Sequence, residues 1–130
     1  MPTLRWTRYP AAASHTGPVV VMASRFRVRG FRHVVPFLRD AMRVRAQVAR
    51  TPGAVGMSLV AHPLRREFAT LSAWTSREAV DGLVRAEPHR SVMRRHAAAM
   101  ADSRFVIWEA DAADLPIDPA DAHARLAEPA

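Results

Sequence analysis

The chain contains no Cys, no Lys and no Asn among its 130 residues. Without Cys it has no thiolate nucleophile, no disulfide, and no Cys ligand for haem or an iron–sulfur cluster. Without Lys it forms no Lys Schiff base and has no phosphate-binding loop of the kind that depends on a Lys. Without Asn it has no N-glycosylation acceptor. Several classes of enzyme and metal site are therefore excluded before any motif is considered.

Length and hydropathy are typical of one globular domain. The chain has 130 residues, and 49% of them are hydrophobic, which is enough to build a single core. No segment approaches the roughly 20 apolar residues that a membrane-spanning helix needs. The apolar run over 19–23 is too short and lies too late to be the core of a signal peptide. We therefore expect a cytoplasmic protein without a membrane span.

Basic charge is carried by Arg alone. The chain has 19 basic residues, all Arg, and a formal net charge of +7. Residues 1–110 hold 18 Arg and 7 acidic residues, whereas residues 111–130 hold one Arg and 5 acidic residues. We interpret the Arg residues as a solvated surface, with acidic or phosphorylated partners as the alternative. An acidic tail folded back over a basic body is the simplest account of the uneven charge.

Hydrophobic periodicity predicts four strands and two helical segments in the order β-α-β-β-α-β. This order is that of the ferredoxin-like split βαβ unit, an α+β fold with an antiparallel sheet and helices on one face. Thr75 and Glu78 form a capping box at the second helical segment, and Pro88 is expected to interrupt that segment. The predicted strands cover 19–29, 54–62, 66–74 and 103–111, and the helices cover 33–50 and 75–101.

Three regions follow from this order. Residues 1–17 show no periodicity and are expected to be an N-terminal extension that is dispensable for folding. Residues 18–111 form the ferredoxin-like domain. Residues 112–130 form an acidic tail with a short helix that starts near Asp118. Because helices cover only one face of such a sheet, the other face is expected to pair with a second copy, giving a homodimer.

The stretch from Phe68 to His96, FATLSAWTSREAVDGLVRAEPHRSVMRRH, resembles the dimeric α+β barrel proteins of the antibiotic biosynthesis monooxygenase superfamily. It is similar within that superfamily to uncharacterised bacterial domains related to spheroidene monooxygenase. The resemblance covers about residues 18–111 and rests on the motif TLSxW, a capped helix, and a PH pair that opens the next turn. It implies the fold more strongly than the chemistry, because the superfamily also holds haem-degrading oxygenases, polyketide cyclases and decarboxylases.

The haem-degrading branch combines an Asn on the first strand with a Trp and a His on the second helix. His89 matches the His, but Ser24 stands at the Asn position, and the Trp position falls near Gly82 or Leu83. Haem degradation by that route is therefore not expected. Haem binding through His89 or His96 remains an alternative to having no cofactor, and no other metal site is expected.

One ligand wall is predicted from the strands and the second helix. His89 is the candidate catalytic acid or base because an imidazole exchanges protons near neutral pH; ordinary packing of a half-exposed His is the alternative. Arg25, Arg27 and Arg29 share a strand face that suits an anion, or simply protects an exposed edge. The predicted substrate-binding residues are Trp74, Ser72, Phe68, Met22, Ser24, Phe26 and Met93.

The sequence favours a monooxygenase-like enzyme that acts on a small apolar or aromatic molecule, either without cofactor or with haem. The alternatives are a non-catalytic dimer that binds a small ligand or haem, and a polyketide-cyclase-like enzyme. Nucleic acid is not an expected partner, because the third strand, REFATLSAW, lacks the aromatic run of an RNA-recognition motif.

Overall fold

A five-stranded antiparallel sheet in the order β1–β3–β4–β2–β5 organises the chain. The structure is a computed structural model, and it describes residues 3–127. The strands are β1 (Thr3–Arg8), β2 (Pro18–Val28), β3 (Ala54–His62), β4 (Glu67–Trp74) and β5 (Met100–Asp111). The helices are α1 (Ala11–Ser14), α2 (Val34–Arg50), α3 (Arg77–Arg85), α4 (His89–His96) and α5 (Pro119–Ala127).

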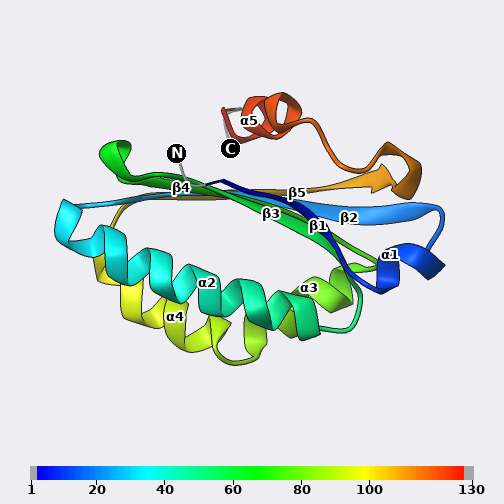
Figure 1. Ribbon diagram of the computed structural model, residues 1–130, viewed down its shortest axis with the longest axis horizontal. Helices are drawn as coiled ribbons and strands as arrows, with labels where there is room; N and C mark the ends of the chain where they lie inside the picture. The colour runs from blue at the N-terminus through cyan, green and yellow to red at the C-terminus, as the bar shows by residue number, and fades with distance from the viewer. Residues whose placement is uncertain (1–2, 128–130) are drawn as a thin grey trace.

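The four strands β2 to β5 with α2, α3 and α4 form the predicted ferredoxin-like unit. Helices α2, α3 and α4 lie together on one side of the sheet (Figure 1). The second helical segment is interrupted as expected, because α3 ends at Arg85 and α4 begins at His89, directly after Pro88. The predicted α+β fold is therefore confirmed. The helix cap differs by one residue: Ser76 Oγ, and not the Thr75 hydroxyl, accepts the hydrogen bond from the Ala79 backbone N–H at 3.2 Å.

Alternation along β2 divides the sheet into two faces. Met22, Ser24 and Phe26 point toward the helices, whereas Val21 and Ala23 belong to a buried cluster on the opposite face. The face toward the helices therefore carries larger and partly polar side chains.

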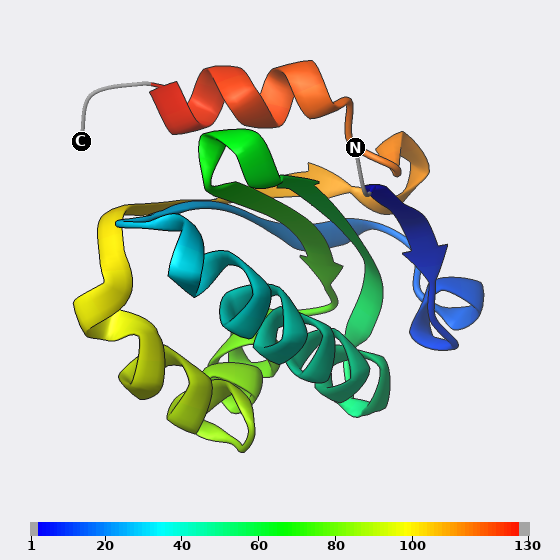
Figure 2. The ribbon, with the colours of Figure 1, turned by 60° about the vertical axis from the view of Figure 1, so that its left-hand side comes forward.

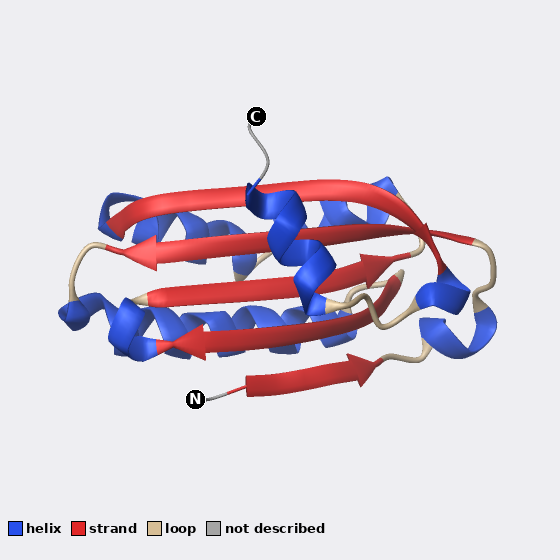
Figure 3. Cartoon of the chain, turned by 90° about the horizontal axis from the view of Figure 1, so that it is seen from above, coloured by secondary structure: helices blue, strands red, loops and turns tan. Residues whose placement is uncertain are grey.

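The opposite face is partly covered by α5, which packs across the strands (Figure 3). Ile117, Ala122 and Leu126 of this segment join Val21 and Ala73 in one buried cluster. The Arg125 guanidinium lies 4.4 Å from the ring centroid of Trp108. The tail thus folds back over the body as expected, through apolar contacts, and occupies part of the face that the sequence assigned to a second copy.

The N-terminal residues contain an edge strand that the sequence analysis missed. β1 pairs antiparallel with β3, from Thr3 opposite Val60 to Arg8 opposite Gly56, and it flanks the sheet in Figure 2. A Cβ at Gly56 would collide with the Trp6 indole, so Gly56 leaves the space that Trp6 fills. The expectation of an irregular extension over 1–17 is wrong for residues 3–8, although residues 1 and 2 lie outside the described part.

No helix within residues 3–127 is long and apolar enough to cross a membrane.

Candidate functional site

A pocket of about 280 Å³ lies between the sheet and the helices; we call it the inner pocket. Its floor comes from the strands and its roof from α2, α3 and α4. A dry cavity of about 150 Å³ holds a benzene molecule, so the inner pocket suits a molecule of about two fused rings. It is lined by Met22, Ser24, Phe26, Phe37, Ala41, Val44, Val48, Met57, Leu59, Phe68, Thr70, Ser72, Leu83, Val84, His89, Val92, Met93, Ser103 and Phe105.

Strand register builds the floor of the inner pocket. Ser24 lies opposite Thr70 on one side and opposite Phe105 on the other, and Thr70 lies opposite Leu59. Cross-strand partners share a face, so these four side chains form one row beneath the helices. Neighbouring rows two residues away along the strands contribute the remaining floor residues by the same alternation.

Most of the predicted substrate-binding residues meet in this pocket. The structure places six of the seven in its lining: Met22, Ser24, Phe26, Phe68, Ser72 and Met93. Trp74 does not line it. Its side chain is fully buried, and its Nε1–H donates a hydrogen bond to Ser72 Oγ at 2.9 Å. Trp74 therefore orients the Ser72 hydroxyl from the next position on the same strand face, without lining the cavity itself.

Hydroxyl groups supply most of the polarity of the floor. Ser24 Oγ and Thr70 Oγ1 are hydrogen bonded to each other across β2 and β4. Ser72 accepts from Trp74, as described above. The hydroxyls of Ser24, Thr70 and Ser72 are thus paired within the protein, which favours a largely dry pocket.

His89 is the titratable side chain of the inner pocket. It is half-buried at the start of α4, and its Nδ1 is buried without a hydrogen-bond partner among residues 3–127. Burial lowers the pKa of His89 below its ordinary 6.5, and a hydrogen-bonding contact with the Val84 backbone opposes this only in part. At neutral pH the imidazole is therefore uncharged, the form that can accept a proton.

His96 lies on the same helix but serves a different role. Its Nε2 is 2.7 Å from Asp40 Oδ2 on α2, and both side chains are buried. His96 is absent from the lining of the inner pocket. Because Nε2 of His96 is hydrogen bonded to the Asp40 carboxylate, His96 is not placed to be an axial ligand for haem in the inner pocket.

The mouth of the inner pocket has an apolar rim. Phe105 is 67% exposed, Val84 43% and Met93 36%, and all three also line the cavity. They come from the edge strand β5, from α3 and from α4. A ligand entering between β5 and these helices would pass over apolar surface before reaching His89.

Arg25 and Arg27 lie away from this site. On β2 they alternate with the pocket residues Ser24 and Phe26 and so belong to the opposite face. Arg25 pairs there with Asp102 at 3.6 Å, and Arg29 donates from Nε to the Ala98 carbonyl at 3.2 Å. The interpretation of this Arg row as an anion cradle for the pocket is therefore wrong.

The inner pocket does not fit a haem. Its volume of about 280 Å³ lies at the lower end of the range of about 300–1,000 Å³ that is typical of small-molecule pockets, and a haem has many more atoms than two fused rings. Among the described residues, no Arg lines it that could pair with the propionates. Within residues 3–127 there is also no group of three or more His, Asp and Glu side chains arranged to hold a metal ion.

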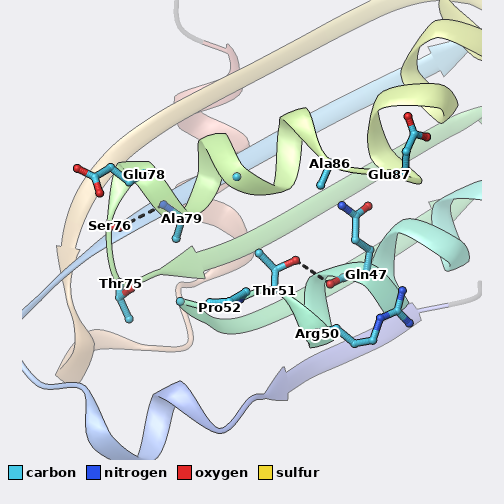
Figure 4. Close-up of a pocket in the computed structure, with 12 residues that line it drawn as sticks. Gln47, Arg50, Thr51, Pro52, Thr75, Ser76, Glu78, Ala79, Ala86 and Glu87 are labelled. Atoms are coloured by element: carbon cyan, nitrogen blue, oxygen red, sulfur yellow. Dashed lines mark hydrogen bonds between the residues drawn. The ribbon is translucent and has the colours of Figure 1, made fainter.

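A second depression, the outer cleft, lies between the C-terminal end of α2 and α3 (Figure 4). Its volume is about 590 Å³, and its lining is more polar than that of the inner pocket. Gly53 has a φ of +90°, and a Cβ there would collide with Ala79 and Thr75, so this turn requires glycine. The cleft is lined by Gln47, Arg50, Thr51, Pro52, Gly53, Thr75, Ser76, Glu78, Ala79, Gly82, Ala86 and Glu87.

Gln47 and Asp40 are the structurally important residues that sequence reasoning missed. At the helical period both lie opposite the apolar positions of α2, where polar residues usually face solvent, yet Asp40 is 1% exposed and Gln47 5%. Gln47 Oε1 accepts the His89 backbone N–H at 2.8 Å. Asp40 and Gln47 are buried because α4 packs over them. The periodicity of α2 alone does not show where α4 lies.

Comparison with solved structures identifies proteins that share the fold of this chain. No family model matches the chain, and no curated relative matches it. A "putative antibiotic biosynthesis monooxygenase" from Nitrosomonas europaea superposes with a TM-score of 0.65 at 16% identity, over 74% of this chain and 93% of that one. SnoaB, a cofactor-independent oxygenase from Streptomyces nogalater, superposes with a TM-score of 0.56 at 23% identity, over 69% and 90%.

A third solved structure, an antibiotic biosynthesis monooxygenase, superposes with a TM-score of 0.58 at 17% identity, over 70% of this chain and 97% of that one. At these identities the likeness bears on the fold. The narrower likeness to domains related to spheroidene monooxygenase stays a prediction. The resemblance to the superfamily is confirmed at that level: this chain has the fold of the antibiotic biosynthesis monooxygenase proteins.

Proposed function

We propose that this protein is a monooxygenase-like enzyme that oxidises a small aromatic molecule in the inner pocket without a cofactor. The observation that carries the proposal is His89, a half-buried imidazole with a lowered pKa in the lining of a mostly apolar cavity. The fold that this chain shares with SnoaB, a cofactor-independent oxygenase, supports the same proposal. We further propose that the enzyme is a cytoplasmic homodimer.

His89 would act as the general base. An electron-rich phenol gives its hydroxyl proton to the imidazole, and the resulting phenolate is oxidised more readily by O₂ than the neutral phenol. One atom of O₂ enters the ring, and the other leaves as water with two hydrogens from the substrate. The apolar roof excludes bulk water from the phenolate, while the hydroxyls of Ser24 and Thr70 lie in the floor beneath it.

The test uses 1,5-naphthalenediol, a two-ring phenol of suitable size. Its oxidation to 5-hydroxy-1,4-naphthoquinone consumes one O₂ and releases one water, so oxygen uptake and product colour report the same reaction. We expect the wild-type protein to accelerate both, and His89→Ala to reduce the rate about 100- to 10,000-fold. His123→Ala is the matched control, because His123 is exposed on α5 across the sheet from the pocket.

A non-catalytic binder of small ligands is the alternative that the pocket itself favours, because His89 is its one titratable lining residue among those described. Binding of the naphthalenediol without any increase in oxygen uptake would support that alternative and contradict the enzyme. A polyketide-cyclase-like activity would use the same pocket without O₂. A sharp Soret band at one equivalent of added haem would instead indicate a pocket that opens to admit haem through His89.

A further inference from the structure

We propose that Gln47 is the positioning residue that holds His89 in the inner pocket, by tying both sides of the break between α3 and α4 to α2. The inference rests on the proposed function in one respect, since it treats His89 as the working group of that pocket. Gln47 itself is absent from the lining of the inner pocket. It acts through the backbone that carries His89.

The contacts of the Gln47 amide span the break. Its Oε1 accepts the His89 backbone N–H at 2.8 Å, and its Nε2 donates to the Leu83 carbonyl at 3.3 Å. Gln47 is 5% exposed. The chain contains no Asn and no second Gln, so its one side-chain amide is used at this place.

The break leaves the His89 backbone N–H without a partner in the helix, while the Leu83 carbonyl, which already accepts the Ala86 backbone N–H at 3.2 Å, can accept a second hydrogen bond. The first N–H groups of a helix have no partner within the helix, and neither do the last carbonyls. α4 begins at His89, and its N-cap residue, Pro88, has no side-chain hydrogen bond to offer. A carboxamide accepts from a donor on one side through its oxygen and donates to an acceptor on the other through its nitrogen, whereas a carboxylate can only accept.

The groups that Gln47 holds are those that form the pocket wall. Leu83 and His89, its two partners, both line the inner pocket, and Val84 between them lines its mouth. In Figure 4 the Gln47 side chain reaches from α2 toward the segment of Ala86 and Glu87, which connects α3 to α4. Gln47 therefore lies in the wall between the outer cleft and the inner pocket.

The test compares Gln47→Met, which removes both hydrogen bonds while filling similar space, with Thr51→Val. Thr51 Oγ1 donates to the Gln47 backbone carbonyl at 2.8 Å in the same turn, so its loss perturbs α2 locally without touching the amide. Two measurements need no turnover: the pKa of His89, followed by NMR of labelled histidine, and the Kd for 1,5-naphthalenediol.

We expect Gln47→Met to shift the pKa of His89 upward toward 6.5, because a released imidazole gains solvent, and to weaken probe binding about tenfold. If the wild-type protein oxidises the probe, kcat should fall about 100-fold, the loss that a displacement of about 1 Å can cause. Thr51→Val should leave the pKa of His89, the Kd and kcat as in the wild type.

Gln47→Asn keeps the amide but is one methylene shorter and cannot reach both partners, so it decides the question if the Met variant does not fold. A folded Met or Asn variant with the His89 pKa and probe affinity of the wild type would overturn the proposal. If the wild-type protein binds the probe without oxidising it, the proposed function fails, yet a His89 pKa that moves with Gln47 still establishes the positioning role.

Discussion

Asp40 and His96 form a buried pair that joins α2 to α4, with His96 Nε2 2.7 Å from Asp40 Oδ2. Burial alone would raise the pKa of Asp40, but hydrogen bonds from His96, Arg43 and Arg95 lower it to about 2. The carboxylate is therefore ionised, and His96 must donate from Nε2. The His96 ring also meets Phe37 edge to face, with centroids 5.3 Å apart, and Phe37 lines the inner pocket. The pair thus supports the roof.

Removing the carboxylate should be costly. Asp40→Ala is expected to lower the free energy of unfolding by about 3–5 kcal/mol, because it leaves the buried His96 donor without its partner. Urea denaturation followed by circular dichroism measures the loss. Asp81→Ala is the control: Asp81 pairs with Arg77 at 3.5 Å on the exposed side of α3, and its loss should cost less than about 1 kcal/mol. Equal effects of the two variants would contradict a structural role for the Asp40 pair.

Acid should destabilise the protein through Asp40. The pKa of this carboxyl is lower in the folded protein, about 2, than its ordinary 3.8, so the unfolded chain binds the proton more readily. The stabilisation is complete above about pH 4 and is lost as the pH falls toward 2, by on the order of 2 kcal/mol. Urea titrations between pH 5 and 2 give the free energy of unfolding of the wild-type protein and of Asp40→Asn. The difference between the two should shrink as the pH approaches 2. A difference that stays constant over this pH range would show that Asp40 is not the group that destabilises the protein in acid.

His89 should extend activity to mildly acidic pH. Its pKa is lowered by burial, so the neutral base persists below pH 6.5, and kcat/KM for the naphthalenediol should fall only at lower pH. Because the pKa of His89 is lower in the folded protein than in the unfolded chain, the unfolded chain takes up the proton at a higher pH. The free energy of unfolding therefore falls as the pH drops from 6.5 toward the pKa of His89 in the folded protein. A rate profile with its midpoint above 6.5 would exclude His89 in its buried state as the base.

The N-terminal strand should contribute to stability, contrary to what the sequence suggested. A chain that begins at Pro18 loses β1 and uncovers the edge of β3. Trp6→Ala leaves a space over Gly56 and should cost on the order of 3 kcal/mol, measured as a lower Tm. Arg5→Ala, at an exposed position of the same strand, should change Tm little. A truncated chain with an unchanged Tm would restore the original expectation that residues 1–17 are dispensable.

A homodimer should form through the face that α5 covers only in part. Val106 and Trp108 on this face are half-buried, and a stable obligate dimer would bury more than ~2,000 Å². Light scattering should give twice the chain mass at micromolar concentration. Val106→Arg should yield a monomer, whereas Phe105→Arg, on the opposite face of the same strand, should not. A monomeric wild-type protein would contradict the proposal.

Periodicity predicted the elements that line the pocket. Phe37, Ala41, Val44 and Val48 recur at helical spacing within the predicted helix over 33–50, and they form the α2 part of the roof. Alternation on two strands likewise placed Ser24 and Phe68 on one face. Such residues are predictable because the spacing of apolar residues along the sequence indicates which face of a helix or strand is buried.

The missed features depend on contacts between distant segments. Asp40 and Gln47 are polar and lie opposite the apolar stripe, so only the position of α4 explains their burial. β1 is a short edge strand whose Trp6 is accommodated by Gly56, 50 positions later. The sequence left the Arg row open as an anion site or a protected edge, because strand alternation places it on a different face from Ser24 and Phe26 without saying what covers that face.

The hydrogen bond between Ser24 and Thr70 has a consequence for selectivity. Because each hydroxyl already has the other as a partner, a hydrocarbon can occupy the pocket without breaking this hydrogen bond. Each oxygen also keeps a free lone pair, so a phenol can join the pair as a third member. Affinity alone should therefore separate phenols from plain aromatic hydrocarbons weakly. Discrimination would have to arise in the reaction itself, where only a substrate with an acidic hydroxyl can give a proton to His89.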